Sequence, residues 1–233
     1  MLKPWLRQRW VIPPQADAAF VARMEDVLRV YARPPDPLRP LVCFDEAGKE
    51  LRREVRPHQP ARPGRPARHD SEYAREGSAN LFLWVAPHLG QRQITVTIQR
   101  TAVDWAHAMR DLVDGAFPQA ERIVLVQDNL DTHDPASLYK AFPPAEAARI
   151  WSRLEFHFTP THGSWLNLAE LELSALARQC LDRRLPDQPT LATETAAWAE
   201  NRNRAGVSID WHFNILEARR TLTHLYPIPA CDT

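Results

Sequence analysis

Three carboxylate residues stand where acidic side chains can support metal-dependent chemistry. Asp45 directly follows the apolar run Leu41–Phe44, and Asp128 comes two positions after the apolar run 123–126. Glu170 lies near the start of a stretch with helical periodicity. Three such carboxylates can hold two divalent cations, which activate water or a sugar hydroxyl and stabilise the leaving oxygen of a phosphodiester. Oxygen ligands favour Mg²⁺ or Mn²⁺ over zinc.

Each of these residues also has a purely structural interpretation. Aspartate is common in the turn after a strand, and a single helical glutamate is usually a solvated surface residue. Glu170 borders the apolar stripe of its predicted helix, whereas Glu172 lies farther around the helix from this stripe. Glu46 points away from its neighbour Asp45 on an extended strand, so it is the weaker ligand candidate. The combination of three carboxylates favours a metal-binding site over three separate structural roles.

The elements that must position these residues are predicted from hydrophobic periodicity. Strands are predicted at 41–44, 81–85, 94–98, 123–126 and 155–158, and helices at 16–31, 102–117, 135–141, 145–153, 167–181, 190–204 and 215–226. Strands come first and then alternate with helices, which indicates an α/β fold with a mixed sheet. In such sheets ligands bind outside the carboxyl ends of the strands, where both aspartates are expected.

The motifs around the three carboxylates resemble the catalytic domain of DDE transposases, in the mariner-type superfamily and its bacterial insertion sequence 630 branch. The motifs are Cys-Phe-Asp-Glu at 43–46, Val-Gln-Asp-Asn-Leu-Asp-Thr-His at 126–133, and Thr-Pro-Thr-His-Gly-Ser-Trp-Leu-Asn-Leu-Ala-Glu at 159–170. They occur in this order along the chain. The resemblance extends from about Leu41 to Tyr226, most of the sequence.

This resemblance implies an RNase H-like fold, a mixed sheet flanked by helices. It implies that Asp45, Asp128 and Glu170 are the catalytic and metal-binding residues, holding Mg²⁺ or Mn²⁺, with two ions expected. The implied reaction is cleavage of double-stranded DNA at transposon ends, followed by transfer of the freed 3′-hydroxyl into target DNA, usually at TA. A homodimer is expected by analogy, as is action in the bacterial cytoplasm, at the nucleoid.

Several neighbouring residues are candidates for supporting roles. Asn129 and His133 resemble positions that follow the second aspartate in this branch. His162 is expected either to hydrogen-bond a DNA phosphate or the site carboxylates, or to cap the helix that starts at 167. Two other functions stay open: an inactive transposase remnant that binds DNA or a partner without catalysis, and an RNase H-like nuclease that is not a transposase.

A basic, proline-rich segment follows the first strand. Its prolines recur every third residue from 57 to 66, and so do Arg62, Arg65 and Arg68, with Arg56 in phase. This spacing predicts a polyproline II helix with the arginines along one edge. We hypothesise that these four arginines contact DNA phosphates, because a phosphate can accept two parallel hydrogen bonds from one arginine side chain. A solvated loop is the alternative.

The sequence departs from the family pattern in two respects. Asp128 and Glu170 are 42 positions apart, which is longer than the usual mariner spacing and predicts an insertion near 143–153. The single N-terminal helix also allows no helix-turn-helix module. We therefore expect residues 1–40 to be a linker and helix leading in from a missing DNA-binding region, 41–205 to be the catalytic domain, and 206–233 to be a helical tail.

Composition excludes several classes of protein. With 29 basic and 29 acidic residues, the chain is not a strongly basic, histone-like DNA binder. Three cysteines without a CxxC pair argue against a disulfide framework or a zinc module. No apolar run reaches the length of about 18 residues that a membrane span needs, and no signal-peptide h-region is visible, so neither membrane insertion nor secretion is expected.

Overall fold

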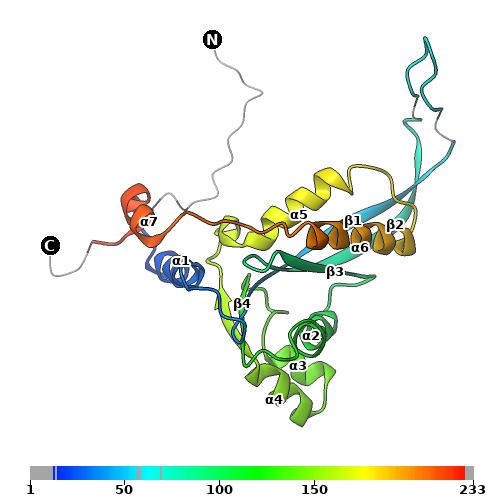
Figure 1. The fold of residues 1–233 in the computed structure, drawn as a ribbon. Coiled ribbons are helices and arrows are strands. Elements are labelled where there is room, and N and C mark those ends of the chain that lie inside the picture. Colours follow the sequence, from blue (N-terminus) through cyan, green and yellow to red (C-terminus); the bar gives the residue numbers. More distant parts are fainter. Residues whose placement is uncertain (1–12, 14, 57–58, 69, 229–233) are drawn as a thin grey trace, which may run out of the picture.

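A five-stranded mixed sheet forms the centre of the molecule (Figure 1), in a computed structural model that describes residues 13, 15–56, 59–68 and 70–228. The strand order is β3-β2-β1-β4-β5. The strands are β1 (Leu41–Glu54), β2 (Tyr73–Ala86), β3 (Gln91–Thr97), β4 (Ile123–Gln127) and β5 (Leu154–Phe158). The first three are antiparallel neighbours, whereas β4 and β5 run parallel to β1. The predicted mixed sheet is confirmed.

Helices cover both faces of this sheet. They are α1 (Ala18–Tyr31), α2 (Ala102–Asp111), α3 (Ala136–Ala141), α4 (Pro144–Ser152), α5 (Leu168–Gln179), α6 (Gln188–Arg204) and α7 (Ile215–Thr221). Cys43 belongs to an apolar cluster shared with α1, α5, α6 and α7. Its neighbours Val42 and Phe44 belong to a second cluster shared with α2, α3 and α4. This alternation follows from the two-residue period of a strand, which points successive side chains to opposite faces.

Two elements differ in length from the predictions. Strand β1 continues to Glu54 and pairs with β2 as a long two-stranded ribbon, down to the pair Glu54–Tyr73. The predicted helix 102–117 is α-helical only to Asp111 and ends in a π-helical turn, Leu112–Ala116. The segment at 143–153, where an insertion is predicted, forms α4.

The predicted polyproline II helix is wrong. Arg62 and Arg65 exchange backbone hydrogen bonds of 3.0 and 2.8 Å, and Gln59 pairs with Arg68 in the same antiparallel manner. The chain therefore reverses at Pro63-Gly64, where Gly64 has a φ of +75°. Proline followed by a glycine with positive φ is the pattern of a type II turn. The hairpin is favoured because its backbone groups pair across this turn, whereas a polyproline II helix has no internal hydrogen bonds.

The first and last described helices pack on the sheet. Phe20 and Leu28 of α1 and Ala218 of α7 lie in the same buried cluster as Cys43. The division into 1–40, 41–205 and 206–233 stays a prediction, and neither boundary coincides with a break in this cluster. Among the described residues, no helix is both long and apolar enough to cross a membrane.

Candidate active site

The three predicted carboxylates come from three different elements. Asp45 lies within β1, Asp128 directly follows β4, and Glu170 is in the first turn of α5. Cys43 pairs with Val126 in the parallel β1–β4 register. Two residues farther along each segment, Asp45 and Asp128 are therefore neighbours where β4 ends. The prediction that Asp45 follows the end of its strand is wrong, because β1 continues to Glu54 in pairing with β2.

The Asp45 carboxyl lies among other acidic groups. Burial raises the pKa of this carboxyl, and the negative charges of Asp128, Glu170 and Glu46 raise it further, against the lowering effect of the Glu46 backbone N–H, to about 7. The charged groups with the largest effects on the pKa of Asp45 are thus acidic. Such a site favours a bound cation, because a cation would relieve the repulsion and restore the ionised form.

Each aspartate has one oxygen held by the protein. The backbone N–H of Glu46 donates to Oδ1 of Asp45 at 2.8 Å, and Nδ1 of His133 lies 2.5 Å from Oδ1 of Asp128. Within the described part of the chain, the second oxygen of Asp45 has no hydrogen-bond partner, and Oδ1 of Asp128 is held by the ion pair with His133 and not by a hydrogen bond. In the same residues, no three His, Cys, Asp or Glu side chains are grouped closely enough to hold a metal ion as they stand. The hard oxygen donors nevertheless match Mg²⁺ or Mn²⁺ in type.

Asn167 fixes the helix that carries Glu170. Its Oδ1 accepts a hydrogen bond from the Ala169 N–H at 3.1 Å, which caps α5. Its Nδ2 donates to the carbonyl oxygen of Phe44 at 2.9 Å, directly before Asp45. One buried side chain therefore sets the start of α5 against β1. We did not single out Asn167 from the sequence, although asparagine just before a helix is a recognisable N-cap signal.

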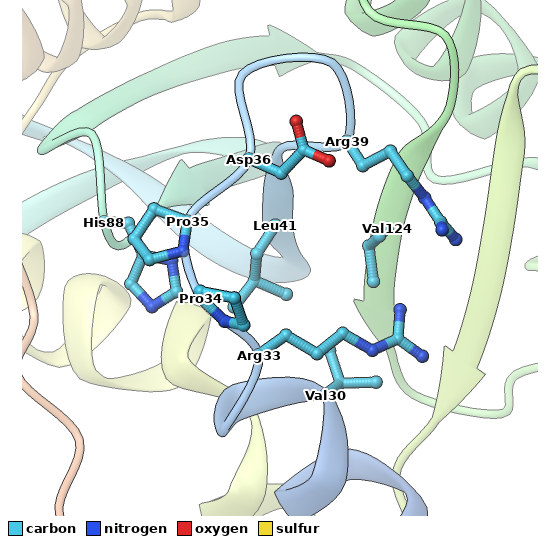
Figure 2. Close-up of a pocket in the computed structure, with 9 residues that line it drawn as sticks. All are labelled: Val30, Arg33, Pro34, Pro35, Asp36, Arg39, Leu41, His88 and Val124. Atoms are coloured by element: carbon cyan, nitrogen blue, oxygen red, sulfur yellow. The ribbon is translucent and has the colours of Figure 1, made fainter.

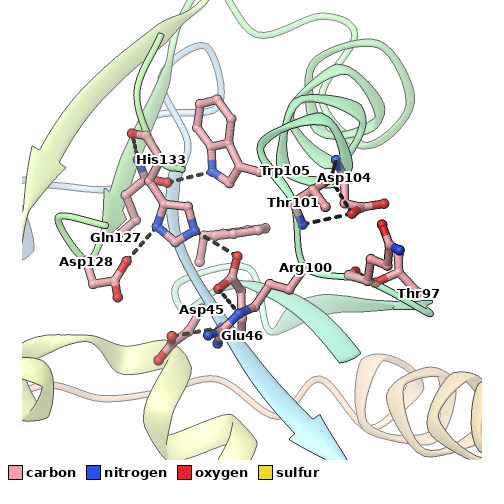
Figure 3. Close-up of polar contacts among 12 residues, drawn as sticks. Asp45, Glu46, Thr97, Arg100, Thr101, Asp104, Trp105, Gln127, Asp128 and His133 are labelled. Atoms are coloured by element: carbon pink, nitrogen blue, oxygen red, sulfur yellow. Dashed lines mark hydrogen bonds and ion pairs between the residues drawn. The ribbon is translucent and has the colours of Figure 1, made fainter. Parts of the chain in front are cut away.

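His133, predicted as a supporting residue, lies between Asp128 and Glu46 (Figure 3). Its Nε2 is 2.8 Å from Oε1 of Glu46, on the side of the ring opposite Asp128. Burial lowers the pKa of His133, but its interactions with Asp128 and Glu46 outweigh burial and raise it to about 9. Glu46 faces away from the Asp45 side chain, as predicted from strand alternation, and it is engaged with His133 instead of being free to bind a metal.

The other two supporting residues line a pocket beside Asp128. This pocket has a volume of about 230 Å³ and is lined by Asp128, Asn129, Leu130, Thr159, Pro160, Thr161, His162 and Ser164. Asn129 and His162 are exposed there. His162 has a φ of +62°, which is uncommon for a residue other than glycine. The helix that follows is capped by Asn167, not by His162.

The four predicted DNA-binding arginines are on the tip of the β1–β2 ribbon, which projects away from the sheet (Figure 1). Arg56 lies 3.5 Å from Asp70 and 3.7 Å from Glu72. The structure therefore separates these arginines from the three carboxylates, and it partly compensates the charge of Arg56.

A second pocket, of about 280 Å³, lies at the other end of β1 and β4 (Figure 2). Arg33 and Arg39 line it, and both form ion pairs with Glu155 of β5, the first at 2.7 Å. None of the three predicted carboxylates lines this pocket. It is therefore separate from the candidate site.

Comparisons with known proteins agree with this architecture. The fold is RNase H-like: the chain matches the crystal structure of the Mos1 mariner paired-end complex with Mn (TM-score 0.55, 16% identity, 89% of this chain) and that of the Mos1 strand transfer complex (TM-score 0.58, 16% identity, 89% of this chain). The complex with Mg matches over 98% of this chain and 69% of the Mos1 chain (TM-score 0.55, 16% identity).

The chain belongs to the DDE superfamily endonucleases, whose family pattern matches residues 40–192, more than half of the sequence. It spans 63% and 62% of the Mos1 chains in the first two structures. A search of curated proteins gives no significant match.

Proposed function

We propose that this chain is the catalytic domain of a mariner-type transposase of the bacterial insertion sequence 630 branch, which cleaves DNA at transposon ends and transfers the strands into target DNA. The observation that carries the proposal is the placement of Asp45, Asp128 and Glu170 on β1, after β4 and in the first turn of α5, where the charges of Asp128 and Glu170 raise the pKa of the half-buried Asp45. Family membership supports a nuclease reaction. The Mos1 structures similar to this chain are transposase complexes that include a paired-end complex with Mn and a strand transfer complex.

In this proposal, Asp45, Asp128 and Glu170 hold two Mg²⁺ or Mn²⁺ ions. Asp45 and Asp128 contribute the oxygens that Glu46 and His133 leave free, and Glu170 contributes its carboxylate from the first turn of α5. When bound, the cations activate the attacking water or 3′-hydroxyl and stabilise the leaving oxygen. Cation binding requires the three carboxylates to move closer together, because they are not grouped closely enough for coordination as they stand.

The first test of the proposal is Mn²⁺ binding by calorimetry, which does not require knowledge of the DNA ends. We expect the wild type to bind Mn²⁺ and the Asp128→Asn variant to lose this binding while keeping its circular dichroism spectrum. Asp131→Asn, an exposed aspartate three residues farther on, is the matched control and should bind as the wild type does. Equal binding by all three proteins would refute a metal site at Asp128.

We further propose that Arg56, Arg62, Arg65 and Arg68 contact the phosphates of double-stranded DNA, and that two copies of the chain act together on two ends and a TA target. Replacing all four arginines by alanine should reduce the slope of log K against log salt by about 3 to 4. The matched control removes four exposed arginines elsewhere: Arg29, Arg178, Arg204 and Arg220. If both quadruple variants change the slope equally, the ribbon tip is not the DNA contact.

A further inference from the structure

Glu46 is a buried carboxylate with both oxygens engaged. Its side chain is 2% exposed, and it lies on the face of β1 opposite to Asp45. Oε1 is 2.8 Å from Nε2 of His133, and Oε2 is 3.6 Å from Nε of Arg100 (Figure 3). Burial of a charged group is costly unless it is paired. The position of Glu46 therefore depends on its interactions with His133 and Arg100.

The ring of His133 is fixed in place. It is fully buried, stacked on Trp105 with ring centres 5.9 Å apart, and met edge-on by Phe44. Nε2 of Gln127 donates to the His133 carbonyl oxygen at 3.0 Å, and Oε1 of Gln127 accepts from the indole of Trp105 at 3.2 Å. The ring therefore stays in one plane between Glu46 and Asp128.

Asp128 has no comparable support of its own. Its side chain is 34% exposed, it follows the last residue of β4, and the only side-chain contact to its carboxylate within the described residues is the one from His133. The orientation of this carboxylate, and so the direction of its free oxygen, depends on where the His133 ring points. The aromatic packing fixes the plane of the ring, and the acceptor at Nε2, Glu46, sets how the ring is turned within that plane.

We propose that Glu46 and His133 are positioning residues: Glu46 orients the His133 ring, whose Nδ1 forms the ion pair with Oδ1 of Asp128 and leaves Oδ2 directed toward the cation. This inference rests on the proposed function, because it assigns Asp128 as a metal ligand. Groups that orient metal ligands through a histidine hydrogen bond typically change metal affinity by 10- to 100-fold when they are removed.

The test is a double-mutant cycle on Mn²⁺ affinity, measured by calorimetry. Glu46→Leu removes the acceptor at similar volume and should weaken Mn²⁺ binding by about 10- to 100-fold. His133→Asn places an amide donor near the position of Nδ1 but cannot reach Glu46. In that background, Glu46→Leu should therefore cause no further loss. Glu46→Gln, whose amide oxygen can still accept from Nε2, should restore part of the affinity lost in Glu46→Leu.

The control and the contrary outcomes separate this inference from the proposed function. Glu50→Leu, on the same strand but half-buried and paired with Arg52 and Arg75, should leave Mn²⁺ affinity unchanged. If Glu46→Leu weakens binding equally with His133 or Asn at position 133, Glu46 acts directly or by charge, and the positioning role is wrong. If the wild type binds Mn²⁺ in an Asp128-dependent way but neither Glu46 variant differs from it, the positioning role fails alone. If the wild type does not bind Mn²⁺, both proposals fail. Should Glu46→Leu not fold, Glu46→Met takes its place in the cycle, because a thioether fills a similar volume and is only a weak acceptor.

Discussion

Replacing Asp45 by asparagine is expected to remove a pH-dependent loss of stability. In the folded protein the pKa of Asp45 is raised to about 7 from an ordinary value of 3.8. Folded Asp45 therefore keeps its proton as the pH rises through 4, whereas the unfolded chain releases it, so the folded state is progressively disfavoured from about pH 4 to pH 7. With about 1.36 kcal/mol for each unit of pKa difference, the loss amounts to about 4 kcal/mol at pH 8.

Urea unfolding of the wild type and of Asp45→Asn, followed by tryptophan fluorescence without divalent cations, measures this effect. The free energy of unfolding of the variant relative to the wild type should increase by about 4 kcal/mol between pH 4 and pH 8. Asparagine keeps an acceptor for the Glu46 N–H, so this hydrogen bond is conserved. Asp111→Asn, with a side chain 55% exposed, should give a nearly constant difference. A constant difference for Asp45→Asn as well would show that this carboxyl is not strained by burial and neighbouring charge.

Three further substitutions test how α5 is held. Asn167→Ala removes the cap and the bond to Phe44, and should cost about 1–3 kcal/mol of unfolding free energy and weaken Mn²⁺ binding; unchanged Mn²⁺ affinity in a folded variant would show that α5 is positioned without it. Glu172→Ala leaves the fully buried Arg92 without its carboxylate partner and should lower the free energy of unfolding by about 3–5 kcal/mol, measured by chemical denaturation. A decrease below about 1 kcal/mol would argue against this ion pair. Gly163→Ala would place a Cβ 2.4 Å from a proline ring in the same loop and should lower the melting temperature, whereas a neutral result would mean that the loop adjusts freely.

Much of this protein was predictable because the relevant signals are local. Hydrophobic periodicity predicted every strand of the sheet and the helices that cover it, with errors mainly at the ends of the elements. An aspartate directly after an apolar strand is visible in the sequence, and strand alternation alone placed Glu46 on the face opposite to Asp45. The family motifs likewise lie within short segments. Each of these inferences needs only residues that are close neighbours along the chain.

The tertiary structure decided the features that join distant residues. The contact of Asn167 with Phe44 spans 123 positions, and that of His133 with Glu46 spans 87. Pairing across the ribbon turned the arginine–proline segment into a hairpin where its three-residue period predicted an extended helix. The sequence predicted only that Glu172 lies farther around its helix than Glu170. In the structure Glu172 is buried in an ion pair with Arg92 of β3. Hydrophobic periodicity predicts which side of a helix or strand faces the core. It does not predict hydrogen-bond partners, because these depend on how the elements pack against one another.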